Sequence, residues 1–148
     1  MVADPYKRYR QVQVDTTNPV RLVVMLYEAA IGALRQAIAA IERRDYERKG
    51  KELLRAHDIL FELLSCLDHE KGGQVAANLA SLYTYMLKRI LEANRSLEIP
   101  VLEEVIGHLT TLNEGWRQLA EQPRPAVEAA AQRAATELLL GKTAAGER

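Results

Sequence analysis

The sequence predicts an all-α protein: an antiparallel up-and-down four-helix bundle with an N-terminal arm and a short fifth C-terminal helix. From residue 19 onward, apolar residues recur at spacings of three and four, which is the period of an amphipathic helix. Four such segments of about 21 to 26 residues are joined by short connections, and short connections favour antiparallel neighbours. Strand-like alternation of apolar and polar residues does not extend over a useful length.

The first bundle helix is expected from Pro19 to about Arg44. The Asn18 side chain can accept hydrogen bonds from free backbone N–H groups, and Pro19 at the first helical position loses no donor that the helix needs. One apolar stripe runs along this segment. Its members are Leu22, Val23, Leu26, Ala30, Ala33, Leu34, Ala37, Ile38 and Ile41.

The second helix is expected to start at the N-cap Asp45 and to end near Leu67. The run from 68 to 73 ends in Gly72-Gly73 and is expected to be a turn, because paired glycines end helices and permit positive φ. The apolar positions of the second helix are Leu53, Leu54, Leu60, Phe61, Leu63, Leu64 and Leu67.

The third and fourth helices are expected at about 74–95 and 101–121, with Ile99-Pro100 in the connection between them. The inward residues predicted for the third helix are Val75, Leu79, Leu82, Met86, Ile90 and Ala93. Those predicted for the fourth are Leu102, Val105, Ile106, Leu109, Leu112, Trp116 and Leu119.

These elements divide the chain into an N-terminal arm at 1–17, a bundle at 18–122 and a C-terminal region at 123–148. Pro123 and Pro125 form the linker that opens the last region. An Ala-rich fifth helix is expected within 126–140, and the final eight residues are expected to be disordered.

Composition favours a soluble cytosolic protein. Lys+Arg and Asp+Glu both number 20, so the formal net charge is zero, and we expect no concentrated basic face of the kind that nucleic-acid binders show. Cys66 is the single cysteine, which excludes an internal disulfide and fits a reducing cytoplasm. Charged residues interrupt the N-terminal segment, and no stretch is expected to reach the ~20 apolar residues that cross a bilayer. We therefore expect neither a signal peptide nor membrane insertion.

No constellation predicts catalysis. A di-iron bundle needs Glu-x-x-His pairs, and none of His57, His69 and His108 has Glu three residues before it. Glu104 and His108 are four apart, an isolated match without partners on a second helix. A lone helical cysteine such as Cys66 is usually a packed hydrophobe. We expect a binding protein with no metal and no cofactor.

The sequence also holds more apolar and aromatic residues than single helical stripes need. Tyr6 and Tyr9 precede the bundle, and Met25 and Tyr27 widen the first helix's apolar arc. The third helix crowds five such residues together, and i, i+1 and i+3 cannot share one face. They are Leu82, Tyr83, Tyr85, Met86 and Leu87. Two interpretations explain these extra residues equally well. They could line a groove with Tyr and Met that binds a partner peptide, or they could lie on faces that the arm and the fifth helix cover.

Several of these segments resemble the FliS family of flagellar secretion chaperones. The first helix contributes Asn18-Pro19 and Met25-Leu26-Tyr27-Glu28, and the second ends in Leu67-Asp68. The most specific part is the block from Gly72 to Asn94, with Gly72-Gly73-Gln74-Val75-Ala76-Ala77-Asn78-Leu79, Leu82-Tyr83-Thr84-Tyr85-Met86-Leu87-Lys88-Arg89 and Leu91-Glu92-Ala93-Asn94. Trp116 also matches. The likeness covers about residues 4–121, with Ala29 where the family has Gly and no acid after the opening Pro.

This resemblance implies a cytosolic chaperone that binds the disordered C-terminal segment of flagellin, blocks premature polymerisation and presents the subunit to the export gate protein FlhA. It also implies that the arm, with Tyr6 and Tyr9, takes part in binding. Combined with the surplus apolar positions, it predicts a partner-binding set. The members are Tyr6, Tyr9, Met25, Tyr27, Asn78, Leu82, Tyr83 and Met86.

For Asn78, a hydrogen bond to partner backbone and a satisfied packing contact are equal alternatives. The chain is expected to be a monomer or a weak homodimer. Two other functions remain open from the residues alone: a homodimeric structural bundle whose extra apolar faces pair with themselves, and a metalloenzyme bundle.

Overall fold

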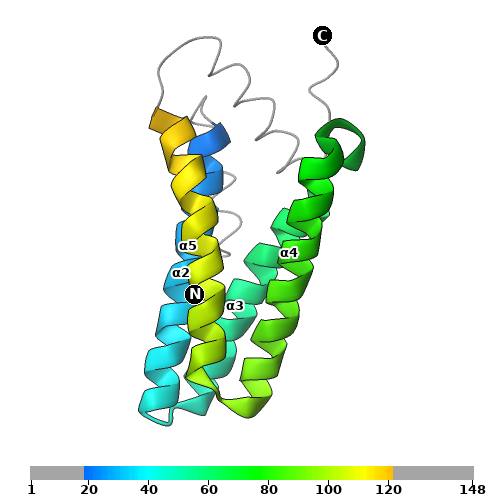
Figure 1. Cartoon of the computed structure of the whole chain (residues 1–148). Coiled ribbons are helices and arrows are strands. Elements are labelled where there is room, and N and C mark those ends of the chain that lie inside the picture. The colour runs from blue at the N-terminus through cyan, green and yellow to red at the C-terminus, as the bar shows by residue number, and fades with distance from the viewer. Residues whose placement is uncertain (1–18, 122–148) are drawn as a thin grey trace, which may run out of the picture.

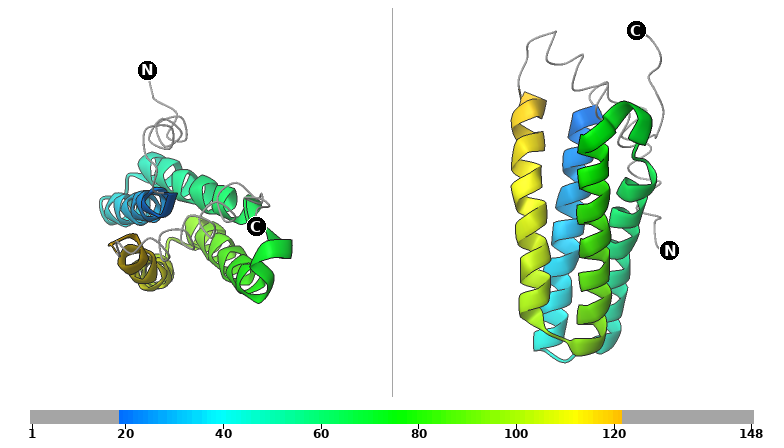
Figure 2. Two further views of the ribbon diagram at one scale, coloured as in Figure 1. Left: turned by 90° about the horizontal axis from the view of Figure 1, so that it is seen from above. Right: turned by 45° about the vertical axis from the view of Figure 1, so that its right-hand side comes forward.

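The computed structural model describes residues 19–121, which form four α-helices (Figure 1). They are α2 (Pro19–Glu42), α3 (Tyr46–Ser65), α4 (His69–Ser96) and α5 (Ile99–Glu121). The helices lie side by side and alternate in direction, with connections of a few residues at the two ends of the bundle (Figure 2). The antiparallel arrangement of four helices is therefore confirmed. The arm at 1–17 and the fifth helix within 126–140 lie outside the described residues.

The four helices form a closed ring of neighbours. Within the described bundle, α2 packs against α3 and α5, and α4 packs against the same two helices. The diagonal pairs, α2 with α4 and α3 with α5, do not bring their backbones together. Contact between the two helices of a diagonal pair is therefore made by side chains alone.

The core is built mainly from aliphatic side chains, and α2 contributes the largest share. Ala30, Ala33, Ala37 and Ala40 are at most 2% exposed. Their small side chains let α2 lie close to its neighbours and leave space for larger residues from the other helices. The apolar stripe predicted for the first helix is confirmed, with Ile38 and Ile41 packed at its edge.

By length and composition alone, α2 is long and apolar enough over Val20–Glu42 to cross a membrane. The expectation that no stretch is long and apolar enough to cross a bilayer is therefore wrong. The reason is visible in the fold: α2 buries residues against both of its neighbours, and the core helix of a soluble bundle has the same composition as a span.

Aspartate caps start two of the helices. Asp45 Oδ1 accepts a hydrogen bond of 3.1 Å from the Arg48 N–H, as predicted for the second helix. Asp68 Oδ1 accepts one of 3.0 Å from the Lys71 N–H and starts α4 at His69. The prediction of a turn over 68–73 is therefore wrong for 69–72. The paired glycines instead produce a break inside α4, where Gly73 has φ 52° and ψ −128°.

Three residues predicted to point inward are exposed: Leu54 by 60%, Phe61 by 55% and Val75 by 66%. Each directly follows or precedes a buried position, Leu53, Leu60 and Ala76 respectively. Adjacent helical residues point about 100° apart, so only one of each pair can face the core. The other inward predictions are buried or packed at the edge of the core.

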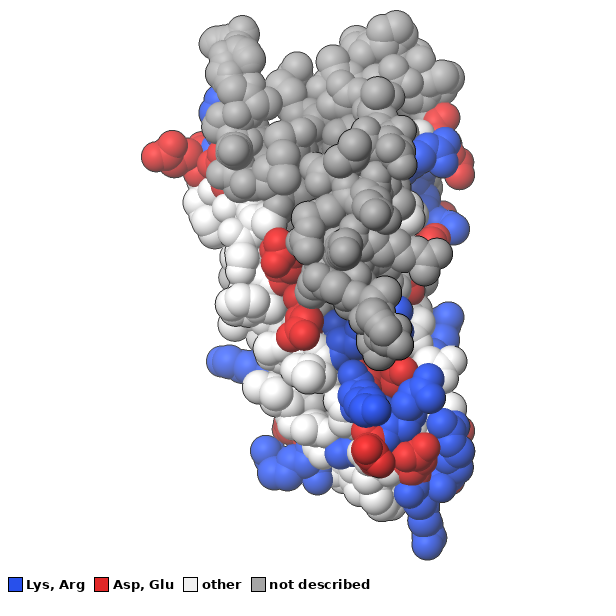
Figure 3. Space-filling model, turned by 180° about the vertical axis from the view of Figure 1, so that it is seen from behind, with Lys and Arg blue, Asp and Glu red and all other residues white. Residues whose placement is uncertain are grey.

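Charged side chains of both signs lie beside uncharged surface on the face seen in Figure 3. Lys and Arg gather toward the end that carries the α2–α3 connection, with acidic groups among them. Arg43 lies 3.9 Å from Asp45, and Arg48 lies 2.8 Å from Glu52, measured between side-chain nitrogen and oxygen. These ion pairs offset part of the positive charge at this end.

Candidate partner-binding site

Tyr27 of α2 and Tyr83 of α4 meet across a diagonal of the bundle. Their hydroxyl oxygens lie 2.6 Å apart, and the two side chains are at most 1% exposed. Burial raises the pKa of Tyr27, with hydrogen bonds to Tyr83 and Trp116 acting in the opposite direction. Burial, followed by the neighbouring Tyr27, raises the pKa of Tyr83 well above its ordinary value. Both hydroxyls are therefore protonated at neutral pH and form an internal link.

Three members of the predicted binding set lie in the core, namely Tyr27, Tyr83 and Met86. A partner could touch them directly only if the bundle opened. Leu82 is half-buried and packs at the edge of the core.

The remaining members lie at or beyond the surface. Met25 is half-buried and lines a depression described below. Asn78 is exposed, and its Oδ1 accepts a hydrogen bond of 2.9 Å from Gln74 Nε2 on the same helix. This bond is local to α4, and the choice between the two alternatives for Asn78 stays open. Tyr6 and Tyr9 fall outside residues 19–121.

Two adjoining depressions, each of about 290 Å³, follow the line between α2 and α5. Together they form what we call the α2–α5 groove. One is lined by Glu28, Ile31, Gly32, Arg35, Thr110, Asn113, Glu114 and Arg117. The other is lined by Arg21, Val24, Met25, Glu28, Arg117, Ala120 and Glu121.

An ion pair stands between the two depressions, because Glu28 and Arg117 line both of them. Arg117 Nη2 donates to Glu28 Oε2 over 2.8 Å, with side chains 54% and 47% exposed. Exposed pairs of this kind contribute about 0–1 kcal/mol, so a bound chain can displace this one easily.

Asn113 is the buried polar residue of the groove. It is 5% exposed, and its Oδ1 has no hydrogen-bond partner among residues 19–121. The sequence interpretation did not select it, although a signal was present: Asn113 lies four residues after Leu109 and three before Trp116, on the inward stripe of α5. Glu28 and Arg117 were also missed as a pair, because 89 positions separate them.

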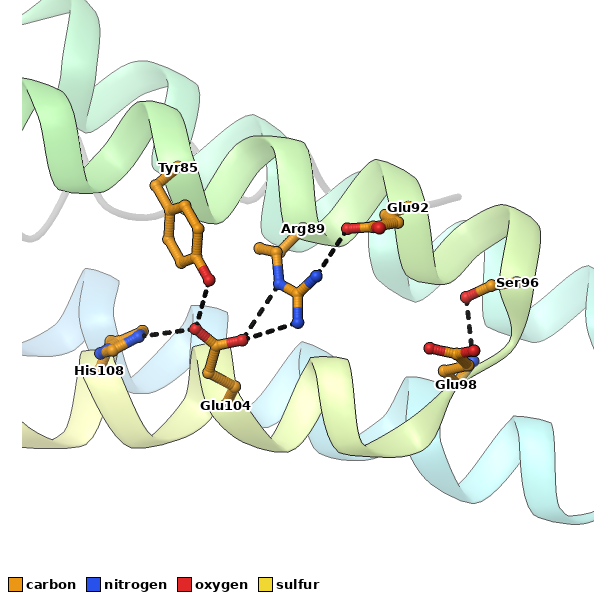
Figure 4. Close-up of polar contacts among 7 residues, drawn as sticks. All are labelled: Tyr85, Arg89, Glu92, Ser96, Glu98, Glu104 and His108. Carbon is orange, nitrogen blue, oxygen red and sulfur yellow. Dashed lines mark hydrogen bonds and ion pairs between the residues drawn. The ribbon is translucent and has the colours of Figure 1, made fainter.

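A polar cluster around Glu104 joins α4 to α5 (Figure 4). Glu104 Oε1 accepts from Arg89 Nε at 3.1 Å and Nη2 at 2.9 Å, while Oε2 accepts from the Tyr85 hydroxyl at 2.6 Å. His108 Nε2 lies 3.1 Å from the same Oε2. The hydrogen bonds to Tyr85, His108 and Arg89 lower the pKa of Glu104 to about 2.

This geometry gives the sequence match between Glu104 and His108 a structural explanation: the two side chains are hydrogen-bonded partners in a helix-to-helix link. Over residues 19–121, no group of three or more His, Cys, Asp or Glu side chains could hold a metal ion. Burial, together with the neighbouring Glu62, raises the pKa of Cys66 to about 12. Its thiol is therefore protonated at neutral pH and is a poor nucleophile.

Comparisons with known proteins identify the family. The family model described as "Flagellar protein FliS" matches residues 2–123. The flagellar secretion chaperone FliS of Salmonella typhimurium is 38% identical over 80% of this chain and 91% of its own length. The Bacillus subtilis FliS is 33% identical over 83% and 91%, and the Pseudomonas aeruginosa FliSB is 40% identical over 74% and 90%. The resemblance drawn from the residues is thus confirmed, as is the prediction of a binding protein rather than an enzyme. The chain belongs to the FliS family of flagellar secretion chaperones.

Proposed function

We propose that this chain is a cytosolic export chaperone that binds the disordered C-terminal segment of a flagellin, prevents its premature polymerisation and delivers it to the export gate protein FlhA. Family membership supports the chaperone class. The observation that carries the proposal for this chain is the α2–α5 groove, whose lining includes the apolar residues Val24, Met25 and Ala120.

A disordered partner suits such a surface. A segment without its own fold can follow a long shallow groove and bury apolar side chains along it, at an entropic cost that tempers affinity. Met25 would contribute an apolar contact in the groove, and Leu82 would contribute a separate one on α4, outside the two depressions. Tyr6 and Tyr9 of the arm would take part in binding. Tyr27, Tyr83 and Met86 would hold the helices beneath in register.

Calorimetry of the full chain with a C-terminal flagellin segment tests the proposal. Binding should show a negative heat-capacity change, because apolar surface leaves water. Met25→Asp and Tyr9→Ala should weaken binding, whereas Leu91→Asp should not, because Leu91 is 56% exposed on α4, away from the α2–α5 groove. Absence of binding by the unaltered chain would overturn the flagellin assignment.

Delivery to the gate is a separate step with a separate test. The purified chaperone–flagellin complex should bind the soluble part of FlhA in a biosensor measurement. A complex that forms but does not bind FlhA would remove the gate from the proposal and leave flagellin binding in place.

Self-association is a second candidate, favoured by one observation on α3. Leu54 and Phe61 are seven residues apart, so they share a helix face, and both are more than half exposed. The His57 ring stacks on Phe61 with centroids 6.4 Å apart and an interplanar angle of 8°. Light scattering should then show a weak dimer that Phe61→Asp converts to a monomer. A monomer at all concentrations would exclude this candidate.

A further inference from the structure

We propose that the Asn113 side chain recognises the peptide backbone of an extended guest segment lying in the α2–α5 groove. This inference deepens the proposed function, since the guest is the flagellin segment proposed above. It assigns a specific contact to a residue outside the predicted binding set.

The first argument is the unpaired carbonyl. Asn113 Oδ1 is buried and has no hydrogen-bond partner within the described bundle. Buried polar atoms in folded proteins are nearly always paired, because an unpaired one loses its hydrogen bonds to water without replacement. An apolar side chain at this inward position of α5 would suit the free protein better. A guest that donates a hydrogen bond to this oxygen would explain why a polar side chain occupies this position.

The second argument is position. Asn113 lines the depression that also contains Gly32 and Thr110, and a guest in this depression would lie against it. Rotation about the terminal torsion of an asparagine is soft, so the carboxamide can turn its oxygen toward the groove at little cost. The amide group then offers both an acceptor and a donor, which is the pattern of a backbone peptide unit.

The chemistry of the groove indicates the class of guest. Its charged residues balance, with three arginines and three glutamates, so it does not form an anion site. A carbonyl acceptor requires a free N–H. The N–H groups in the interior of a helix are already paired, whereas an extended segment leaves its own unpaired. The guest at this point is therefore extended peptide.

Space for that peptide exists beside Gly32. A Cβ atom added at Gly32 would meet no atom within 4 Å, so the surface there is open. The neighbouring Glu28–Arg117 ion pair is about half exposed, and a guest that passes from one depression to the other can displace it. Val24, Met25 and Ala120 then provide apolar contact at the far end.

Asn113→Leu tests the recognition directly, with calorimetry on the full chain and the flagellin segment. The substitution removes the amide but keeps a similar volume, so we expect a higher melting temperature and about tenfold weaker binding. The matched control is Gln74→Leu, which removes an exposed amide from α4 at a residue that lines neither depression, and it should leave the affinity unchanged. The paired result, a more stable protein that binds less well, is one that a purely structural role for Asn113 would not give.

Blocking the groove provides an independent test. Gly32→Leu places a side chain in the open space and should weaken binding at least tenfold. Gly107→Leu is its control, because Gly107 also lies in a helix with nothing within 4 Å of an added Cβ but does not line the groove.

The outcomes separate the two proposals. If the unaltered chain binds the segment and Asn113→Leu binds it equally well, the recognition is wrong and the chaperone function stands. If Gly32→Leu also binds normally, the guest does not use this groove. Failure of the unaltered chain to bind overturns the flagellin assignment itself.

Discussion

The Tyr27 hydroxyl oxygen lies 2.6 Å from that of Tyr83, and this contact joins α2 and α4 across the diagonal of the bundle, where their backbones do not meet. Each hydroxyl is the other's partner in a site closed to water. Removal of one hydroxyl leaves the second without this bond, and burial makes that loss expensive. The pair therefore fixes how the two diagonal helices sit relative to each other.

Tyr27→Phe and Tyr83→Phe should each lower the free energy of unfolding by about 1–3 kcal/mol, because each leaves a buried hydroxyl without this partner. The double substitution removes both hydroxyls, so its effect should be smaller than the sum of the single effects. Urea unfolding of the four proteins of this double-mutant cycle measures the coupling. Additive effects would show that the two hydroxyls do not depend on each other.

The Glu104 cluster should make stability depend on acidity. The pKa of Glu104 is lowered from its ordinary 4.5 to about 2, so the folded state favours the carboxylate. Its contribution is present above about pH 4.5 and is lost as the pH falls toward 2. Glu104→Gln should therefore reduce the melting temperature at pH 6 and differ little from the unaltered protein near pH 2.

Glu103→Gln is the control for that measurement, because Glu103 is the exposed neighbour of Glu104 on the same helix. Its melting temperature should follow the unaltered protein across this pH range. A constant difference between Glu104→Gln and the unaltered protein from pH 6 to pH 2 would contradict the assignment.

Local chemistry made most of the fold predictable. Asn18-Pro19, the Asp45 cap and Ile99-Pro100 placed three helix starts within about two residues, because caps and prolines act through their immediate neighbours. Gly72-Gly73 misled the prediction, because the Asp68 cap is strong enough to start α4 before the glycines. Whether this segment forms a turn or an interrupted helix depends on both residues: Asp68 caps the start of α4, and Gly73 breaks the helix five residues later.

The candidate site was harder to predict, because its contacts join residues far apart in the chain. Met25 was selected because it widens the apolar arc of the first helix, but the depression that it lines also needs Arg117 and Ala120 from α5. Tyr27 and Tyr83 were selected as surplus aromatics, but their hydroxyls satisfy each other across 56 positions. Sequence periodicity identifies an aromatic residue on a stripe and does not reveal its partner.

Adjacent residues on α3 allow a direct test of which face is buried. Leu60 is fully buried and Phe61 is 55% exposed. Leu60→Ala should lower the free energy of unfolding by about 2–5 kcal/mol, since it leaves a cavity in the core. Phe61→Ala should change it by only about 0.5 kcal/mol, as for other surface positions. Chemical denaturation measures both, and a larger effect at Phe61 would mean that the original inward prediction was right.

Gly73 should resist replacement because of its backbone conformation. Its φ of 52° and ψ of −128° lie in a region that side chains with a Cβ rarely adopt, although the added Cβ itself would meet no atom within 4 Å. Gly73→Ala should therefore lower the free energy of unfolding by about 1–3 kcal/mol through backbone strain alone. Gly107→Ala, at a helical position without positive φ, should raise it by about 0.5–1 kcal/mol, because alanine restricts the unfolded chain. Equal effects at the two positions would show that α4 runs through residue 73 without a break, and that Asp68 caps a continuous helix.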